Sequence, residues 1–149
     1  SAASDVYKRQ VLFLLCLCWL PTLSLAKGKS HFTVEDSQYG TRLVKWEGKD
    51  SVVDFNNIQE LKDVKVIGEM AFEMNKYIKQ VILPDNLREI SDFAFARCIN
   101  LKGINLPASL QKIGYRAFGN CESLLFVKYN SNPKVDSSAF MNCPISQEK

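Results

Sequence analysis

The sequence is poor in the residues that most catalytic and metal sites need. It has one histidine, His31, among 149 residues, so no Ser-His-Asp or Cys-His set can be assembled in the second half of the chain. Its seven glycines stand singly, which excludes the clustered glycines of a phosphate-binding loop. A metal site has three or four converging ligands, usually with histidine among them, and the one histidine lies outside the second half of the chain. We therefore expect a protein that is not an enzyme and holds neither a metal nor a cofactor.

An excess of one charge is also missing. The formal net charge is only +3, and the charged residues are dispersed along the chain. A charge this weak does not predict a nucleic-acid-binding face. With 46% hydrophobic and 23% charged residues, the composition is that of a globular protein, and the length suits one domain.

No apolar run is long enough to cross a membrane. The longest, residues 11–20, has ten residues and would span about 15 Å as a helix, against a hydrocarbon core of about 30 Å. A basic pair precedes it, Pro21 breaks it, and small residues allow cleavage after Ala26. This layout is typical of a secretory signal peptide over residues 11–26; a buried helix or an uncleaved anchor is the alternative. Residues 1–10 have no periodicity and are interpreted as an extraneous or truncated leader.

A motif recurs at a fixed short period through the second half of the chain. It places an Ala-Phe pair four residues after an isoleucine, as in Ile67 with Ala71-Phe72, Ile90 with Ala94-Phe95, and Ile113 with Ala117-Phe118. The period is 23 residues, and a last Ala139-Phe140 follows after 22. Such a period predicts a solenoid, in which each coil buries its apolar face only against its neighbours. Residues 67–149 thus divide into about three and a half coils.

Within a coil, the pattern separates inward from outward positions. Leu101, Ile104 and Leu106 are spaced to face the core, the last two at strand period, and Pro107 ends the strand. The phenylalanines of the motif repeat in one slot and are predicted to form a core stack: Phe72, Phe95, Phe118 and Phe140.

The residues before the first coil are predicted to cover it. Residues 27–41 are polar and are interpreted as a flexible lead-in. Two β-prone runs, 42–46 and 51–55, flank a four-residue turn that contains a glycine. This pattern predicts a β-hairpin, and we assign residues 42–66 to an N-terminal cap.

The unit from Ile90 to Lys112 resembles the BspA-like leucine-rich repeat of microbial surface proteins, with the pattern I-G-x-x-A-F-x-x-C-x-x-L-x-x-I-x-L-P-x-S-L, and the likeness covers residues 67–143. The resemblance implies a leucine-rich-repeat solenoid of the α/β class, dominated by short stacked strands with short helical or 3-10 turns. It also implies extracellular or cell-surface interaction, including adhesion, and no catalytic residues.

The repeat also departs from this pattern. Asn75 stands in the first coil where later coils have cysteine, and Tyr129 and Asn130 replace Leu-Pro in the third. In the family a further strand follows the closing repeat, whereas this sequence ends half a coil later, so we expect a C-terminal truncation.

Three cysteines, Cys98, Cys121 and Cys143, share one slot of the repeat. Equivalent positions in adjacent coils lie about 4.8 Å apart. A ladder of small buried side chains is the favoured interpretation. A disulfide, which this Cα spacing permits, and a metal site remain alternatives.

One outward row of the strands is a candidate binding surface, since Ile82 and Phe126 are apolar at positions predicted to face solvent. Its residues are Lys79, Gln80, Ile82, Lys102, Asn105, Phe126 and Lys128. We expect a secreted or surface-displayed protein, monomeric and without a membrane span after signal cleavage, that binds an extracellular protein or matrix partner and no nucleic acid. The alternative is a structural spacer, a fragment of a larger surface protein that carries another functional domain.

Overall fold

A computed structural model describes residues 32–145 of the chain, and these lie within one compact unit. Ten strands and one 3-10 helix follow one another: β1 (Phe32–Ser37), β2 (Gly40–Trp46), β3 (Val52–Asp54), η1 (Phe55–Asn57), β4 (Val64–Ile67), β5 (Gln80–Ile82), β6 (Glu89–Ile90), β7 (Gly103–Leu106), β8 (Lys112–Ile113), β9 (Phe126–Tyr129) and β10 (Lys134–Val135). No helix among these residues has the length and hydropathy to cross a membrane. The predicted signal peptide, residues 11–26, and the leader, residues 1–10, lie outside the described residues.

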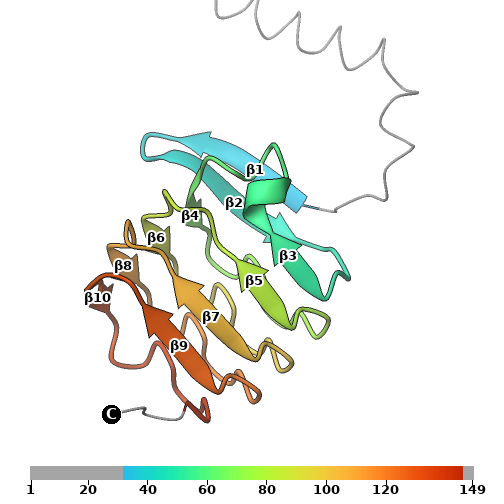
Figure 1. Cartoon of the computed structure of the whole chain (residues 1–149), viewed down its shortest axis with the longest axis vertical. Helices are drawn as coiled ribbons and strands as arrows, with labels where there is room; N and C mark the ends of the chain where they lie inside the picture. Colours follow the sequence, from blue (N-terminus) through green and yellow to red (C-terminus); the bar gives the residue numbers. More distant parts are fainter. Residues whose placement is uncertain (1–31, 146–149) are drawn as a thin grey trace, which may run out of the picture. The chain divides into compact units, whose positions relative to one another are not determined.

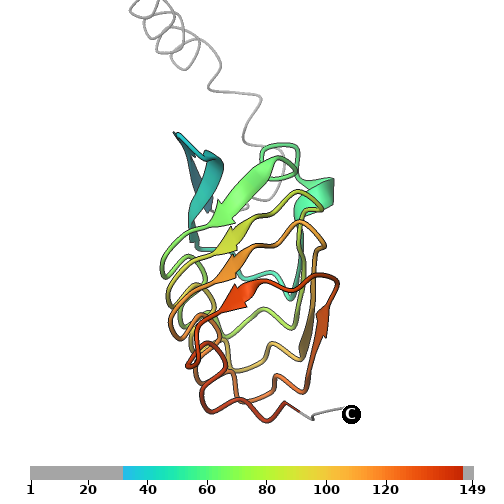
Figure 2. The ribbon, with the colours of Figure 1, turned by 90° about the vertical axis from the view of Figure 1, so that its left-hand side faces the viewer.

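The strands form a β-solenoid of about four turns (Figures 1 and 2). From β2 onward, successive strands alternate between two sheets. The first sheet has the order β1-β2-β4-β6-β8-β10 and the second has the order β3-β5-β7-β9. Each coil therefore gives one strand to each sheet, and the predicted leucine-rich-repeat solenoid is confirmed.

Parallel pairing in register explains the sequence period. In the second sheet, Val81 pairs with Ile104, and Ile104 pairs with Val127. In the first sheet, Ile67 pairs with Ile90, and Ile90 pairs with Ile113. A parallel ladder places equivalent residues of neighbouring coils side by side, so the 23-residue spacing aligns apolar side chains through the core.

The corners that close each coil are chains of tight turns. The N–H groups of Ala117, Gly119 and Cys121 donate to carbonyls three residues earlier, which is the pairing of the short 3-10 turns that the family resemblance implies. Left-handed residues interrupt this pairing, for example Arg116 (φ 45°) and Asn120 (φ 59°). A regular helix therefore does not form there, and η1 is the one helix in the described range.

The cap differs from the prediction. The hairpin consists of β1 and β2, which pair antiparallel over residues 32–46, whereas β2 and β3 do not pair. Instead β2 pairs with β4 in the first sheet and β3 with β5 in the second. Residues 42–66 are thus the first coil of the solenoid, and the turn between β2 and β3 leads from one sheet to the other.

The predicted flexible lead-in, residues 27–41, is also wrong from residue 32 onward, because residues 32–37 and 40–41 are strand. Phe32 and Val34 are half-buried against the core, and the Phe32 ring stacks on Trp46 at a centroid distance of 5.7 Å. This packing stabilises a strand whose polar composition favours a loop. Residues 27–31 lie outside the described part.

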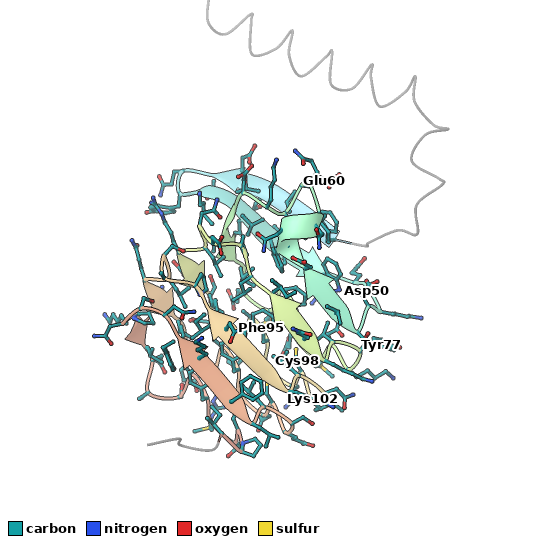
Figure 3. The ribbon with its side chains drawn as sticks, in the orientation of Figure 1. Asp50, Glu60, Tyr77, Phe95, Cys98 and Lys102 are labelled. Atoms are coloured by element: carbon teal, nitrogen blue, oxygen red, sulfur yellow. The ribbon has the colours of Figure 1, made fainter. Side chains whose placement is uncertain are left out.

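A ladder of aromatic rings runs through the core. The motif phenylalanines stack with centroid distances of 4.7 Å for Phe72–Phe95, 5.1 Å for Phe95–Phe118 and 5.0 Å for Phe118–Phe140. The predicted core stack is confirmed, and Trp46 extends it toward the hairpin at 5.7 Å from Phe72. Figure 3 marks Phe95, a fully buried ring of the ladder.

Candidate interaction surface

The outward side of β5, β7 and β9, which we call the outer face, carries the residues predicted to bind a partner. Strand alternation turns every second side chain away from the core. All seven predicted residues are exposed on this face: Lys79, Gln80, Ile82, Lys102, Asn105, Phe126 and Lys128. In Figure 1 the three strands lie side by side in the second sheet.

Register brings these side chains into rows across the coils. Gln80 pairs with Gly103, and Gly103 pairs with Phe126. Asn105 pairs with Lys128 in the next outward row. Lys102, which Figure 3 marks at the start of β7, donates its backbone N–H to the Lys79 carbonyl at 3.1 Å. The structure therefore places the predicted residues next to one another on a rigid support.

Phe126 lies across the middle of the outer face. Its side chain is 57% exposed, although phenylalanine is usually buried. A Cβ built on Gly103 would lie 2.3 Å from two of its ring carbons. The ring therefore occupies the space that a side chain at position 103 would fill. The tip of a large apolar side chain therefore rests on β7, while more than half of the residue is exposed.

The sequence analysis missed the contribution of Gly103. Its signal is nonetheless present, since the equivalent slots of the neighbouring coils hold Gln80 and Phe126. A glycine in a strand often marks the close approach of another group, and here that group is the ring of the next coil.

A shallow hollow of about 550 Å³ occupies the outer face. It extends over β3 as well, because Val52 pairs with Gln80 and is 50% exposed. Its lining also includes residues that the sequence analysis did not select for binding, among them Ser51, Val52, Asn56, Asp85, Pro107 and Asn130. The candidate surface therefore covers all four strands of the second sheet.

Among the described residues, the lysines of the outer face form no ion pairs. Within residues 32–145 the ion pairs are Arg42–Glu35 at 3.9 Å and Lys112–Glu89 at 3.2 Å, both in the first sheet. Lys79, Lys102 and Lys128 take part in neither. Their ammonium groups are exposed to water and can therefore form ion pairs with the carboxylates of a ligand.

The cysteine slot forms a hydrogen-bonded ladder inside the solenoid. Each Sγ donates to the phenylalanine carbonyl of the preceding coil: Cys98 to Phe72 at 3.1 Å, Cys121 to Phe95 at 3.1 Å, and Cys143 to Phe118 at 3.0 Å. All three are free thiols in the structure. Asn75 takes the same slot in its coil, and its Nδ2 donates to the Gly48 carbonyl at 3.1 Å. The slot thus links adjacent coils, in agreement with the packing interpretation.

Two of these three thiols, Cys98 and Cys121, have raised pKa values. Burial raises the pKa of Cys98 from 9.0 to about 12. The neighbouring Cys143 thiol, and then burial, raise the pKa of Cys121 as well. The Cys121 thiol lowers the pKa of Cys143, the one of the three that solvent partly reaches. Because the thiolate is the nucleophile, Cys98 and Cys121 are poor nucleophiles at neutral pH. Within the described range, no three His, Cys, Asp or Glu residues converge to hold a metal ion.

Comparison with known protein families identifies the family of the repeat. The BspA type leucine rich repeat region matches residues 50–148, in six copies. The chain belongs to this family. The match begins 17 residues before Ile67, which agrees with the observation that the predicted cap contains the first coil.

Two solved structures are similar to this chain. A leucine-rich repeat protein from T. pallidum is 24% identical, with a TM-score of 0.56 over 80% of this chain and 69% of that chain. The pneumococcal vaccine antigen PcpA is 29% identical, with a TM-score of 0.50 over 62% of this chain. The match covers 22% of PcpA, so this chain corresponds to a small part of that protein. No protein of curated function matches significantly.

Proposed function

We propose that this BspA-type solenoid is a secreted or cell-surface protein that binds an extracellular protein or matrix partner through its outer face. The exposed side chain of Phe126, whose ring tip lies over Gly103, carries the proposal. Ile82, Val52 and Leu125 are also 38–52% exposed on or beside this face. Contiguous apolar surface with a polar rim is typical of interaction sites. Adhesion is the role this surface suits, and it requires no catalytic group.

The rigidity of the support favours binding. A side chain that is already ordered loses little rotamer freedom when a partner covers it. Phe126 rests on the sheet, and its strand is paired in register along β7. Aromatic groups held in this way are frequent binding hot spots.

A location outside the cell is part of the proposal. The predicted signal peptide at residues 11–26 supports it, as does the likeness to PcpA, a pneumococcal vaccine antigen. Export would place the outer face where host or matrix proteins can reach it, and the protein would act there as a monomer.

Retention of matrix proteins tests the proposed function. The purified protein is immobilised and exposed to a panel of purified extracellular matrix proteins. We expect at least one to be retained, and we expect Ile82→Asp and Phe126→Asp to abolish its retention. Tyr39→Asp is the matched control, because Tyr39 is a 70% exposed aromatic residue on the β1–β2 hairpin. Retention that survives both outer-face variants would show that another surface binds, and no retention at all would contradict the function.

A structural spacer is the second candidate. The same pairing register repeats from coil to coil, and such coils stack into extended arrays. A complete open reading frame with many further coils and a separate terminal domain would favour this role. In that case the outer-face variants should leave the activity of the full-length protein unchanged.

A further inference from the structure

The charges around the hollow indicate which partner chemistry it suits, and this step rests on the function proposed above. We infer that the outer face binds a protein segment in which a large apolar side chain is flanked by carboxylates, with the carboxylates at the Lys79–Lys102 end of the strands.

The cations lie on both sides of the apolar centre. Lys102 is joined through its carbonyl to the backbone N–H of Leu125, at 2.9 Å, immediately before Phe126. Lys79 is its neighbour in the preceding coil. Lys128 follows Phe126 by two residues on the same face, about 7 Å along the strand. A segment that crosses Phe126 therefore meets ammonium groups before and after it.

The apolar side chains that line the hollow favour an apolar group of the partner between those charges. Phe126 and Ile82 are exposed outward, and both line the hollow. A large side chain placed there would exclude water from the lysines beside it. Charge pairs that lose their water in this way discriminate between partners more strongly than pairs at a wet surface.

A uniform polyanion fits the same surface poorly. Asp85 lines the hollow, and Asp54 pairs with Ile82 in an outward row. These carboxylates repel a chain that is negative along its whole length, such as a nucleic acid or a sulfated glycan. They also favour one orientation, because both lie at the end of the strands opposite to Lys79 and Lys102, on β3 and after β5. Lys128 lies at that same end, but on β9. The surface thus favours a mixed, amphipathic peptide.

Selection from a random peptide library tests this chemistry. The full chain is immobilised and exposed to phage that display random linear dodecapeptides. We expect the selected peptides to contain an aromatic or large aliphatic residue with Asp or Glu within two positions. Synthetic versions in which lysine replaces those acids should bind at least tenfold more weakly. Binding should also weaken as salt rises, since exposed charge pairs are screened.

Charge reversal on the protein provides the second arm. The double variant Lys79→Glu/Lys102→Glu should reduce affinity for the selected peptides at least tenfold, and Lys79→Gln/Lys102→Gln should reduce it less. Lys62→Glu/Lys134→Glu is the matched control, because both lysines are exposed and lie outside the hollow. Circular dichroism verifies that each variant is folded.

The possible outcomes separate this inference from the proposed function. The inference would be overturned if the selected peptides lacked acidic residues or if no peptide were selected. It would also be overturned if the Lys79→Glu/Lys102→Glu protein bound the peptides as tightly as the Lys62→Glu/Lys134→Glu control. Binding of heparin that depends on Lys79 and Lys102 and exceeds peptide binding would overturn it too. If a matrix protein is retained through Phe126 but is insensitive to both lysines and to salt, the proposed function holds and the partner chemistry is wrong.

Discussion

Within the described residues, seven positions in the closing corners adopt left-handed backbone, and none of them is glycine. Each of the first three corners has two of these residues, and the last has one. The slot before the repeated alanine holds Met70, Phe93 and Arg116, and the slot three after it holds Met74, Arg97, Asn120 and Asn142, all with φ between 45° and 60°. Left-handed backbone costs an ordinary L-residue about 1–2 kcal/mol, whereas asparagine adopts it more readily. A contact between coils offsets the cost, because the N–H of Arg97 donates to the Gly119 carbonyl at 2.8 Å.

Replacing one of these residues by asparagine should therefore stabilise the protein. Arg97 is exposed and has φ 58°, so Arg97→Asn keeps the backbone bond and relieves the strain. We expect the free energy of unfolding to rise by about 0.5–1 kcal/mol, measured by urea unfolding followed by circular dichroism. Arg88→Asn is the matched control at an exposed position outside the left-handed set, and it should not stabilise. Equal effects of the two substitutions would remove the backbone explanation.

The sequence contains only a partial signal for these corners. Asn120 and Asn142 are the residue type that left-handed positions favour, and they occur in the same slot. Met74 and Arg97 occupy that slot in the other coils. Neither residue type favours left-handed backbone, so the slot cannot be recognised as left-handed from these two coils. The contact that compensates comes from the next coil and is absent from any local pattern.

At the scale of elements, the aromatic ladder and the outer face use the same residue type in opposite ways. Phe95 is fully buried between Phe72 and Phe118, whereas Phe126 is 57% exposed. Truncation of a buried phenylalanine removes apolar burial and leaves a cavity, at a cost of about 3–5 kcal/mol. Truncation of an exposed one usually changes stability by about 0.5 kcal/mol or less.

Alanine substitution of each phenylalanine separates the two roles. We expect Phe95→Ala to lower the free energy of unfolding by at least about 3 kcal/mol. We expect Phe126→Ala to leave stability nearly unchanged while weakening partner binding. Urea unfolding and the matrix-protein assay measure the two effects. A strongly destabilised Phe126→Ala protein would mean that the ring stabilises the fold and is not reserved for a partner.

The strands that could be predicted are those whose side chains repeat. The spacing of Ile67, Ile90 and Ile113 predicted the stacked coils, the inward residues and the phenylalanine ladder. The cap was predicted less well, because two β-prone runs separated by a short turn suggest a local hairpin. The strand partner of β2 is instead β4, more than 15 residues further along the chain. β1 was missed because its pairing and the contact of Phe32 with Trp46 stabilise a polar segment.

For the candidate surface, the outward residues could be predicted from the sequence, but the positions of their side chains and the shape of the hollow could not. Strand alternation alone predicts that Ile82 and Phe126 face solvent. The position of the Phe126 ring over Gly103 depends on how one side chain settles on the neighbouring strand. The extension onto Val52 depends on β3 joining the second sheet, which the predicted hairpin had excluded.

Across the whole solenoid, each coil contacts only the coils before and after it. β6 pairs with β4 and β8, and β7 pairs with β5 and β9. In such a structure, stability is approximately a sum of coil terms and nearest-neighbour terms. One complete period can therefore be removed if the flanking coils meet in the same register.

Deletion of residues 90–112 should accordingly leave a folded protein. It joins Glu89 to Ile113, so that an isoleucine follows Glu89 as before, and it brings β5 next to β9 and Phe72 next to Phe118. The variant should unfold cooperatively, with a denaturant m-value lower by roughly a fifth, because m scales with the surface exposed on unfolding. Deletion of residues 101–112 is the control, since it removes β7 and half a coil and leaves inward side chains without equivalent partners. Circular dichroism and urea unfolding distinguish the two, and a 90–112 deletion that fails to fold while the half-coil deletion folds would show that the coils are not interchangeable units.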